Sequence, residues 1–299
     1  EVSVRSGRRV AEALRDAGLE VRVLDADAAL LPSLAAERPD VVVPLLHGQA
    51  GEDGAVRDVL ELLGISYVGS RPEACRGAFD KPAAKATLER AGVDVPGGVV
   101  LPHATFRELG AGAVLDALVH QLGLPLMVKP SRGGSALGAS VVSTEAALPA
   151  AMVAAFAYAD TALVERLVLG TEVAVSVVDL GAGPVALPGV EIVPDGGVYD
   201  YAARYTAGAT EFFAPARLDA AVAQRCADVA LTAHAGLGLR DLSRSDLIVD
   251  ASGTPWFLEA NVAPGMTETS LLPQAVGAAG LDLGTVCRAL VERAAARGS

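Results

Sequence analysis

Two strand-like segments near the C-terminus, joined by a short turn, constrain the fold of this chain more than any other feature. Residues 241–249 and 255–261 are rich in apolar side chains, and the turn-like sequence DASG lies between them at 250–253. This pattern predicts a β-hairpin. Side chains two positions apart in a strand share a face, so pairing across the turn places Asp246 about opposite Glu259.

The polar side chains of this hairpin indicate a cation site. Asp246, Glu259 and the amide of Asn261 lie among apolar neighbours, and two carboxylates in such a setting repel each other unless a cation lies between them. Ligand sets made only of oxygen favour Mg²⁺, which commonly bridges nucleotide phosphates. The alternative is an exposed strand face on which Arg244 pairs with Asp246.

Hydrophobic periodicity predicts mixed α/β structure in three successive units, 1–70, 71–166 and 167–299. The first unit is predicted to have helices at 3–17 and 55–63 and strands at 21–24, 40–46 and 65–68. The second is predicted to have helices at 81–91, 113–122 and 145–156 and strands near Val99 and at 126–129, 139–142 and 163–166. The third is predicted to have strands at 172–178, 185–193, 241–249 and 255–261 and helices at 219–235, 271–279 and 283–295.

Composition argues against several kinds of partner. The net charge is −12 and no basic stripe is present, so a nucleic-acid partner is not expected. No stretch of 18 apolar residues is free of charge, so no membrane span is expected either. The three cysteines, at 75, 226 and 287, lie far apart, which fits small buried side chains in a reducing cytoplasm. An anionic ligand would have to be bound by a few local cations.

Lysine is rare in this chain. There are 21 arginines but only three lysines, Lys81, Lys85 and Lys129. Where arginine is the default, a retained lysine is expected at places that need a compact charge on a flexible stem. Chance is the alternative for at least one of the three.

A glycine-rich sequence, KPSRGGSALG at 129–138, lies between two predicted strands. Its glycines allow backbone N–H groups to approach an anion, and Lys129 and Arg132 add positive charge. It is not a P-loop, since no Gly-Lys-Ser/Thr ends it and no helix follows directly. From this segment alone, phosphate binding and a plain glycine-rich hairpin are equally open.

Two further segments could contribute to a site. The sequence HGQAGEDG at 47–54 directly follows a predicted buried strand, at the edge where parallel sheets bind ligands, and this places His47 toward the crevice. Asp53 or Glu52 could instead cap the next helix. The loop at 199–213 holds five of the twelve aromatic residues, which suits either closure over a ligand or local packing.

Together these motifs resemble the D-alanine–D-alanine ligase family. The resemblance runs from Val2 almost to the C-terminus and rests on HGQAGEDG at 47–54, DK at 80–81, VKPSRGGSALG at 128–138, VER at 164–166, YDYAARY at 199–205 and LEANVAPGMTETSL at 258–271. Several motifs in the right order are far more specific than any one of them. The resemblance implies an ATP-grasp fold of α/β (α+β) class with three subdomains, in which ATP lies between two antiparallel sheets. The N-terminal subdomain would be Rossmann-like and would lack its first strand here, because the chain opens directly into a helix.

The resemblance also implies how the nucleotide and its metal ions are bound. ATP would be held by Lys81, Lys129 and Arg204 at the phosphates, by Glu165, Leu167 and Val168 at adenine, and by Glu172 at the ribose. Two Mg²⁺ ions, for which Mn²⁺ could substitute, would be held by Asp246, Glu259 and Asn261.

A second set of roles concerns the amino-acid substrates. His47 would lie by the first D-alanine, and Arg244 and the N–H of Gly265 would form the oxyanion pocket. Ser270 and the N–H of Leu271 would bind the carboxylate of the second D-alanine. Ser135, which also belongs to the nucleotide site, and Tyr205 would form part of a hydrogen-bonded group that closes the aromatic loop.

Three positions depart from the family pattern. Of an N-terminal Ser-x-Glu-x-x-Val-Ser motif only Glu1-Val2-Ser3 is present, so the glutamate that holds the first D-alanine's ammonium would lie two positions before residue 1. A chain beginning at Glu1 is therefore expected to be unstable or inactive. Arg204 stands where a YDYEAKY-type motif has lysine, which preserves the positive charge. Ala136 replaces a frequent serine, a minor change.

The implied activity is ATP-dependent ligation of two D-alanines through an acyl phosphate, for peptidoglycan precursor synthesis by a cytoplasmic enzyme that is expected to be a homodimer. One alternative is a ligase whose second substrate is D-lactate or D-serine, against which Ser135 with Tyr205 resembles the dipeptide-forming pattern. Another is a catalytically dead nucleotide-binding protein. The N-terminus and Arg204 favour that alternative, and the intact set of Asp246, Glu259 and Asn261 argues against it.

Overall fold

The N-terminal part of the chain is a small α/β layer around one pair of parallel strands. The computed structural model describes residues 2–134, 136–195 and 208–298. β1 (Val41–Val42) pairs in parallel with β2 (Ser66–Tyr67). The helices of this part are α1 (Val2–Asp16), α2 (Leu30–Ala36), α3 (Gln49–Glu52), α4 (Ala55–Leu62) and α5 (Pro72–Phe79).

Two strand predictions in this layer need correction. All residues of the strand predicted at 21–24 are described, and none of them is in a strand, because Val23 and Leu24 lie exposed beside no strand of the described chain. The strand predicted at 40–46 is shortened to Val41–Val42, because its partner β2 offers only two residues for pairing. The helices predicted at 3–17 and 55–63 are confirmed to within a residue.

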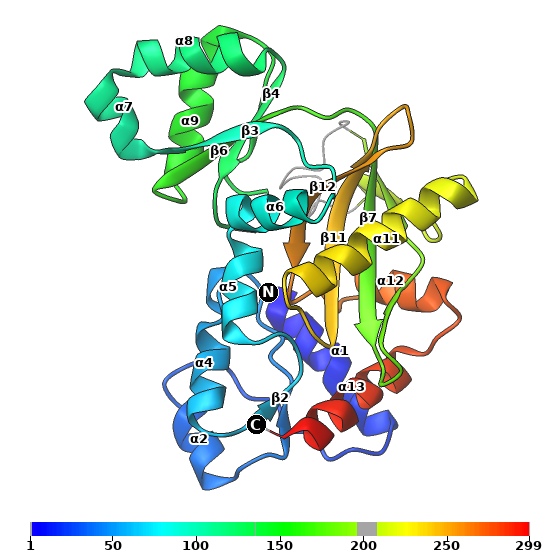
Figure 1. Cartoon of the computed structure of the whole chain (residues 1–299). Coiled ribbons are helices and arrows are strands. Elements are labelled where there is room, and N and C mark those ends of the chain that lie inside the picture. The colour runs from blue at the N-terminus through cyan, green and yellow to red at the C-terminus, as the bar shows by residue number, and fades with distance from the viewer. Residues whose placement is uncertain (1, 135, 196–207, 299) are drawn as a thin grey trace.

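The middle part of the chain builds a four-stranded antiparallel sheet in the order β3-β6-β4-β5, seen at the top of Figure 1. Its strands are β3 (Gly98–Pro102), β4 (Leu126–Pro130), β5 (Ser140–Val142) and β6 (Thr161–Arg166). Its helices are α6 (Lys81–Arg90), α7 (His103–Leu109), α8 (Ala111–Leu122), the 3₁₀ turn η1 (Glu145–Ala147) and α9 (Leu148–Phe156).

The alternation of side chains in this sheet decides which residues are available for a ligand. Val128 of β4 and Val164 of β6 pack into a core with α8 and α9. Neighbouring side chains in a strand point to opposite faces. Lys129 and Glu165 therefore lie on the face of the sheet away from these helices.

The C-terminal part forms a six-stranded antiparallel sheet in the order β10-β9-β7-β11-β12, with β8 beside β7. Its strands are β7 (Thr171–Asp179), β8 (Pro184–Ala186), β9 (Val190–Pro194), β10 (Thr210–Phe213), β11 (Leu242–Val249) and β12 (Pro255–Asn261). Its helices are α11 (Ala220–Gly236), α12 (Leu271–Ala278) and α13 (Leu283–Arg297). The predicted strand at 185–193 is thus two strands, and the end of the predicted aromatic loop is strand β10.

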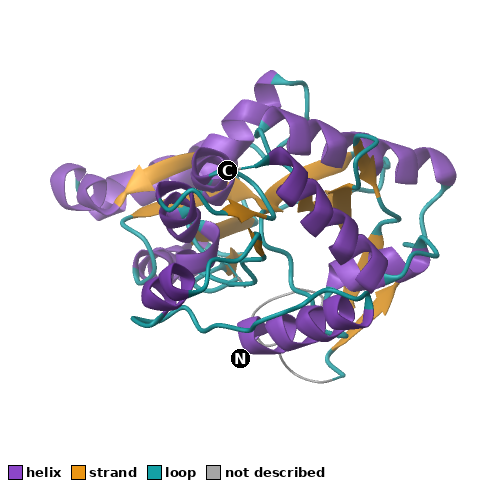
Figure 2. Cartoon of the chain, turned by 90° about the horizontal axis from the view of Figure 1, so that it is seen from below, coloured by secondary structure: helices purple, strands orange, loops and turns teal. Residues whose placement is uncertain are grey.

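Helices cover both faces of this larger sheet, as Figure 2 shows. In β7 the odd-numbered Val173, Val175 and Val177 pack against α11, whereas Ala174 and Val178 pack against α12, α13 and α1. A β-branched strand that is buried on both faces favours such a central position. Helix α1 therefore shares a core with the C-terminal helices, and the predicted unit boundaries at 70 and 166 stay predictions.

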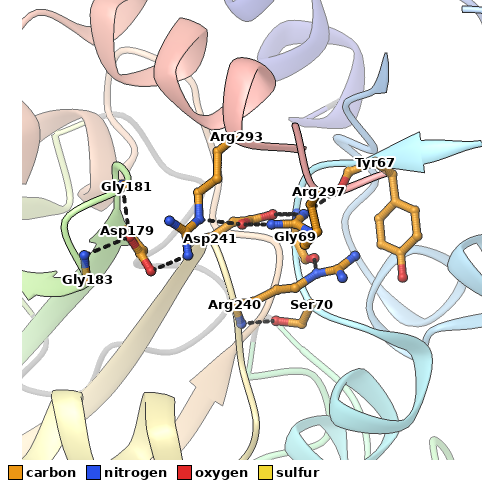
Figure 3. A network of polar contacts seen from close by, with 10 residues as sticks. All are labelled: Tyr67, Gly69, Ser70, Asp179, Gly181, Gly183, Arg240, Asp241, Arg293 and Arg297. Carbon is orange, nitrogen blue, oxygen red and sulfur yellow. Dashed lines mark hydrogen bonds and ion pairs between the residues drawn. The ribbon is translucent and has the colours of Figure 1, made fainter. Parts of the chain in front are cut away.

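A buried ionic network joins the N-terminal layer to the larger sheet (Figure 3). The carboxylate of Asp241, fully buried just before β11, accepts hydrogen bonds from the Gly69 N–H at 2.7 Å and from Arg297 of α13 at 2.7 and 2.9 Å. Arg293 of α13 reaches Asp179 at the end of β7 at 2.6 Å. Asp241 also has φ of +65°, a conformation that L-residues rarely adopt. The network thus fixes the start of the strand that carries Arg244 and Asp246.

We expect Asp241→Ala to lower the free energy of unfolding by about 3 kcal/mol, because it removes one partner of a buried ion pair and leaves the other without its counter-charge. Alanine also tolerates the positive φ poorly. Denaturant unfolding would measure the change. The exposed Asp228→Ala on α11 is the matched control and should change stability by less than about 0.5 kcal/mol; equal stability of the two variants would show that the network contributes nothing.

Candidate active site

The predicted register of the β11–β12 hairpin is confirmed. Asp246 pairs with Glu259 and Arg244 pairs with Asn261 across the two strands, and the ladder shifts by one residue immediately after Asp246. Arg244 and Asp246 are 7% and 3% exposed, so the exposed strand face considered as the alternative is wrong. The ion pair that it invoked is nevertheless present, because Arg244 donates to both oxygens of Asp246, Nε at 2.6 Å and one Nη at 2.8 Å.

Lys81 connects this hairpin to the glycine-rich loop. Its Nζ lies 3.2 Å from a carboxylate oxygen of Glu259 and donates to the carbonyl of Gly133 at 2.6 Å. Lys81 is the first residue of α6, whose start is defined by the Asp80 carboxylate accepting from the Ala83 N–H at 3.1 Å. The capping interaction therefore places a cation between two segments that are more than 100 residues apart in the chain.

Glu165 is the centre of a second buried ionic group. Its carboxylate contacts the ammonium of Lys129 at 2.6 Å and that of Lys85 on the other oxygen. Burial raises the pKa of Glu165, but the charges of Lys129 and Lys85 outweigh it and hold the pKa below its ordinary value. Sequence reasoning gave no role to Lys85. The feature of the sequence that could have indicated a role for Lys85 is its position one helical turn after Lys81, which places both ammonium groups on one face of α6.

The residues predicted at the nucleobase and ribose lie where the chain passes from one antiparallel sheet to the other. Leu167 and Val168 directly follow β6 of the four-stranded sheet, and Glu172 is the second residue of β7 in the six-stranded sheet. The N–H of Leu167 donates to the Pro125 carbonyl at 3.1 Å, which ties this connection to the start of β4. The segment therefore lies where a ligand could contact both sheets.

His47 is held by the N-terminal helix and by the segment that follows β12. Its Nδ1 lies 2.9 Å from the carbonyl oxygen of Ala263, so this nitrogen carries the proton, and Nε2 lies 3.1 Å from the hydroxyl of Ser6. Ser6 is fully buried and also accepts from the Met266 N–H at 3.0 Å. Sequence reasoning missed Ser6, for which the only signal was a serine on the apolar side of the first helix.

Burial lowers the pKa of His47, which predicts a loss of stability in acid. The unfolded chain takes up a proton near pH 6.5, whereas the folded chain does so only at lower pH, so stability present above pH 6.5 is lost as the pH falls below it. Burial lowers the pKa of His234 in the same direction. Thermal unfolding at pH 7.5 and pH 5.5 should therefore show a lower Tm at pH 5.5. His47→Gln should reduce this difference and the exposed His120→Gln should not; an unchanged difference in His47→Gln would refute the assignment.

The glycines of the HGQAGEDG motif allow close backbone approach. A Cβ on Gly51 would lie 2.1 Å from the carbonyl oxygen of Leu46, and Gly54 has φ of +89°. The Asp53 carboxylate accepts from the Ala55 N–H at 2.9 Å just before α4, but the N-cap residue of this helix is Gly54, so neither Asp53 nor Glu52 is its cap. Glu52 instead accepts from the Gly48 N–H at 2.8 Å.

The residues predicted at the second amino-acid substrate form a tight turn before α12. A Cβ on Gly265 would lie 2.6 Å from the hydroxyl oxygen of Ser270. Ser270 in turn accepts from the Thr267 N–H at 3.0 Å and precedes Leu271, the first residue of α12. The backbone N–H groups at the start of a helix have no partner within the helix and bind anions. A carboxylate therefore fits this place.

Some predicted residues lie outside the described part of the chain. Ser135, Arg204 and Tyr205 are among them, as is most of the aromatic loop at 199–213. At the described end of that loop, the guanidinium of Arg217 lies 3.5 Å over the ring of Phe213. This contact fits local packing of that one aromatic.

The oxygen donors on the hairpin fit a hard divalent cation. The described residues contain no group of three or more His, Cys, Asp or Glu side chains arranged for a metal. Asp246 and Glu259 are registered neighbours, and Asn261 supplies an amide oxygen two residues further on. Their present cationic contacts, Arg244 and Lys81, show that this place is built for positive charge.

None of the helices among the described residues is long and apolar enough to cross a membrane.

Comparison with known proteins identifies the family. The sequence signature of the D-ala D-ala ligase C-terminus matches residues 87–292, and that of the D-ala D-ala ligase N-terminus matches residues 30–70. The D-alanine–D-alanine ligase of Anaeromyxobacter dehalogenans strain 2CP-1 is 41% identical over 295 residues, which are 99% of this chain and 92% of the relative. That of Bordetella petrii is 38% identical over 297 residues, which are 99% of this chain and 89% of the relative.

Solved structures agree with the sequence comparison. The crystal structure of the D-alanine–D-alanine ligase from Bacillus anthracis has a TM-score of 0.82 at 28% identity, covering 98% of this chain and 92% of that chain. A crystal structure of D-alanine–D-alanine ligase from Bacillus anthracis complexed with ATP gives a TM-score of 0.81 at 27% identity, covering 98% of this chain and 91% of that chain. The VanG D-Ala:D-Ser ligase from Enterococcus faecalis gives 0.76 at 31% identity, covering 85% and 73%.

Two antiparallel sheets with lysines and a glycine-rich loop between them, facing a hairpin of acids, define the ATP-grasp class of ATP-dependent ligases. Within that class, the chain belongs to the D-alanine–D-alanine ligase family.

Proposed function

We propose that this chain joins two D-alanines into D-alanyl-D-alanine with conversion of ATP to ADP and phosphate, as a step of peptidoglycan precursor synthesis. The observation that carries the proposal is the contact of Lys81 with both Glu259 and Gly133. It brings the acids of the hairpin to the glycine-rich loop, which is where a nucleotide's terminal phosphates must meet a metal and a cation. We also propose that the enzyme acts in the cytoplasm as a homodimer.

The nucleotide is proposed to lie between the two sheets. Lys81 and Lys129, together with Arg204, neutralise its phosphates. Glu165 accepts from the adenine amino group, and the backbone at Leu167 and Val168 contacts the ring. Glu172 takes the ribose hydroxyls. The support for this arrangement is that Lys129 and Glu165 lie on β4 and β6 of the four-stranded sheet, whereas Glu172 lies on β7 of the six-stranded sheet.

The metal is proposed to be held by Asp246, Glu259 and Asn261. These donors are hard oxygens on registered strands, a set that suits two Mg²⁺ ions or Mn²⁺. When bound, Mg²⁺ would neutralise charge on the transferring phosphoryl group. Arg244, which now neutralises Asp246, would then direct its donors toward the substrate.

The amino-acid substrates are proposed to lie between the hairpin and the start of α12. His47 stands beside the first D-alanine. Ser270 and the N–H of Leu271 bind the carboxylate of the second D-alanine at the helix N-terminus. Ser135 and Tyr205 are proposed to close the aromatic loop over both substrates.

The residues then serve two successive steps. In the first, a carboxylate oxygen of the first D-alanine bonds to the γ-phosphorus and ADP leaves, while Lys81 and Lys129 balance the charge. In the second, the amine of the other D-alanine attacks the acyl carbon. Arg244 and the N–H of Gly265 stabilise the tetrahedral oxyanion, phosphate leaves and the amine gives up its proton. The enclosing loop keeps water from hydrolysing the acyl phosphate.

One measurement tests the choice of second substrate. Phosphate release is followed with D-alanine alone and with D-alanine plus D-lactate or D-serine, from pH 6 to pH 9, and the product is identified by mass. The proposal expects the dipeptide of D-alanine at every pH. D-serine is the second candidate, because a D-Ala:D-Ser ligase is among the structural neighbours. A product that contains D-serine or D-lactate in preference to a second D-alanine would overturn the specificity proposed here.

A further inference from the structure

All three lysines of the chain converge on one region, and one of them has no role in the reaction described above. Lys81 contacts Glu259, whereas Lys85 and Lys129 contact the two oxygens of Glu165. Arginine supplies every other basic side chain. Lys85 is therefore placed in the nucleotide site by the fold, and its function has to be sought there.

The two lysines on Glu165 differ in how firmly they are placed. The side chain of Lys85 is 6% exposed and that of Lys129 is 12% exposed, against 2% for Glu165. Lys85 extends from the middle of α6, and the same helix places Leu88 in the core beneath the larger sheet. Lys129 lies at the end of β4, next to the glycine-rich loop. Lys129 is thus the one that can turn to an incoming phosphate.

Charge in this group supports an exchange of partners. Two ammonium groups and one carboxylate leave one positive charge in excess, which favours an anionic ligand. Burial, together with the neighbouring charge of Lys129, lowers the pKa of Lys85 to about 7. The other charge acting on both lysines is that of Glu259 on β12. If the ammonium of Lys129 moves to a phosphate, its repulsion of the Lys85 ammonium decreases, and the ion pair between Lys85 and Glu165 becomes stronger.

We propose that Lys85 is a positioning residue that remains on Glu165 when Lys129 turns to the nucleotide, and that it thereby keeps Glu165 an ionised acceptor for the 6-amino group of adenine. This inference rests on the proposed function, because it assumes that Glu165 faces the base. The consequence is a preference for adenine nucleotides over 6-oxo purine nucleotides. A buried carboxylate without a cation takes up a proton, and a protonated Glu165 would donate to a 6-oxo purine rather than accept from a 6-amino purine.

The test compares the nucleotide preference of three variants, Lys85→Met, Lys85→Arg and Lys129→Met. KM and kcat are measured with ATP and with ITP, and the Kd is measured for ADP and IDP. Lys85→Met should weaken binding of ATP and ADP by about 10-fold or more, the effect of one lost hydrogen bond to a charged group. It should weaken ITP and IDP much less. Lys129→Met should weaken both purines alike, and Lys85→Arg should restore part of the adenine preference.

Two results would overturn the proposal: a Lys85→Met variant that weakens both purines to the same extent, and one that leaves both unchanged. If that variant does not fold, Lys85→Gln, which keeps a polar side chain but removes the charge, should show the same selective loss for ATP and ADP, and an equal loss for both purines would overturn the proposal. The binding arm needs no turnover. If the wild-type protein prefers ADP over IDP but makes no dipeptide, the proposed function is contradicted. The role of Lys85 is then still decided by the binding measurements on the variants. Equal binding of both purines by wild type would contradict the placement of the base.

Discussion

Glu259→Gln is expected to lower kcat for D-alanyl-D-alanine synthesis by about 10²-fold or more, comparable to the loss of one preorganised donor in an oxyanion site. The substitution keeps the size of the side chain but removes the charge opposite Asp246 and beside Lys81. The proposed metal would lose an anionic ligand, and Lys81 would lose the contact that directs it toward the glycine-rich loop. The loss should appear in kcat and in the Mg²⁺ concentration needed for half-maximal rate.

The matched control is Glu292→Gln, which removes the same charge from an exposed position on α13 where Glu292 pairs with Arg288 along the helix. It should retain the wild-type rate. Steady-state ADP formation at several Mg²⁺ concentrations measures both variants. A Glu259→Gln enzyme with near-normal turnover would remove Glu259 from the site, whatever its effect on stability.

Arg244→Ala should have an effect of similar size on turnover and a second effect on stability. Arg244 is the proposed oxyanion donor, so kcat should fall by about 10²–10³-fold. It also donates to both oxygens of the buried Asp246. Removing one partner of a buried ion pair typically costs about 3–5 kcal/mol, because the other charge is left buried.

Arg244→Lys separates the two effects. Lysine keeps the positive charge beside Asp246 but has no planar fork for two parallel hydrogen bonds. We expect this variant to recover most of the stability in denaturant unfolding while its kcat stays far below that of wild type. If Arg244→Lys were as active as wild type, the charge alone would suffice and the proposed donor geometry would be wrong.

The hairpin could be predicted from the sequence because its determinants are local. The alternation of polar and apolar residues in 241–249 and 255–261 gives the face, and the turn at 250–253 gives the register. These two facts predict that Asp246 lies about opposite Glu259, and the observed pairing also depends on a one-residue register shift after Asp246, which the local pattern does not encode. The same reasoning gave most helices and strands of the two larger sheets, but not helix α7 at His103–Leu109.

Other features could not be predicted in this way, because they depend on contacts between distant segments. The pairing of Lys85 with Glu165 joins a helix to a strand 80 residues away, and no local pattern encodes it. Ser6 gains its role only when α1 lies against His47 and Met266. The strand predicted at 21–24 fails for the converse reason: its local pattern is suitable, but among the described residues no strand lies beside it.

A crystal structure of the protein with a non-hydrolysable ATP analogue and Mn²⁺ would test most directly whether the acids and the amide of the β11–β12 hairpin bind the metal ion that accompanies the nucleotide. We predict anomalous peaks touching oxygens of Asp246, Glu259 and Asn261 on one side and the β- and γ-phosphates on the other, with the base against Glu165. Anomalous peaks that show Mn²⁺ away from these three residues, or a nucleotide bound outside the space between the two sheets, would contradict the account.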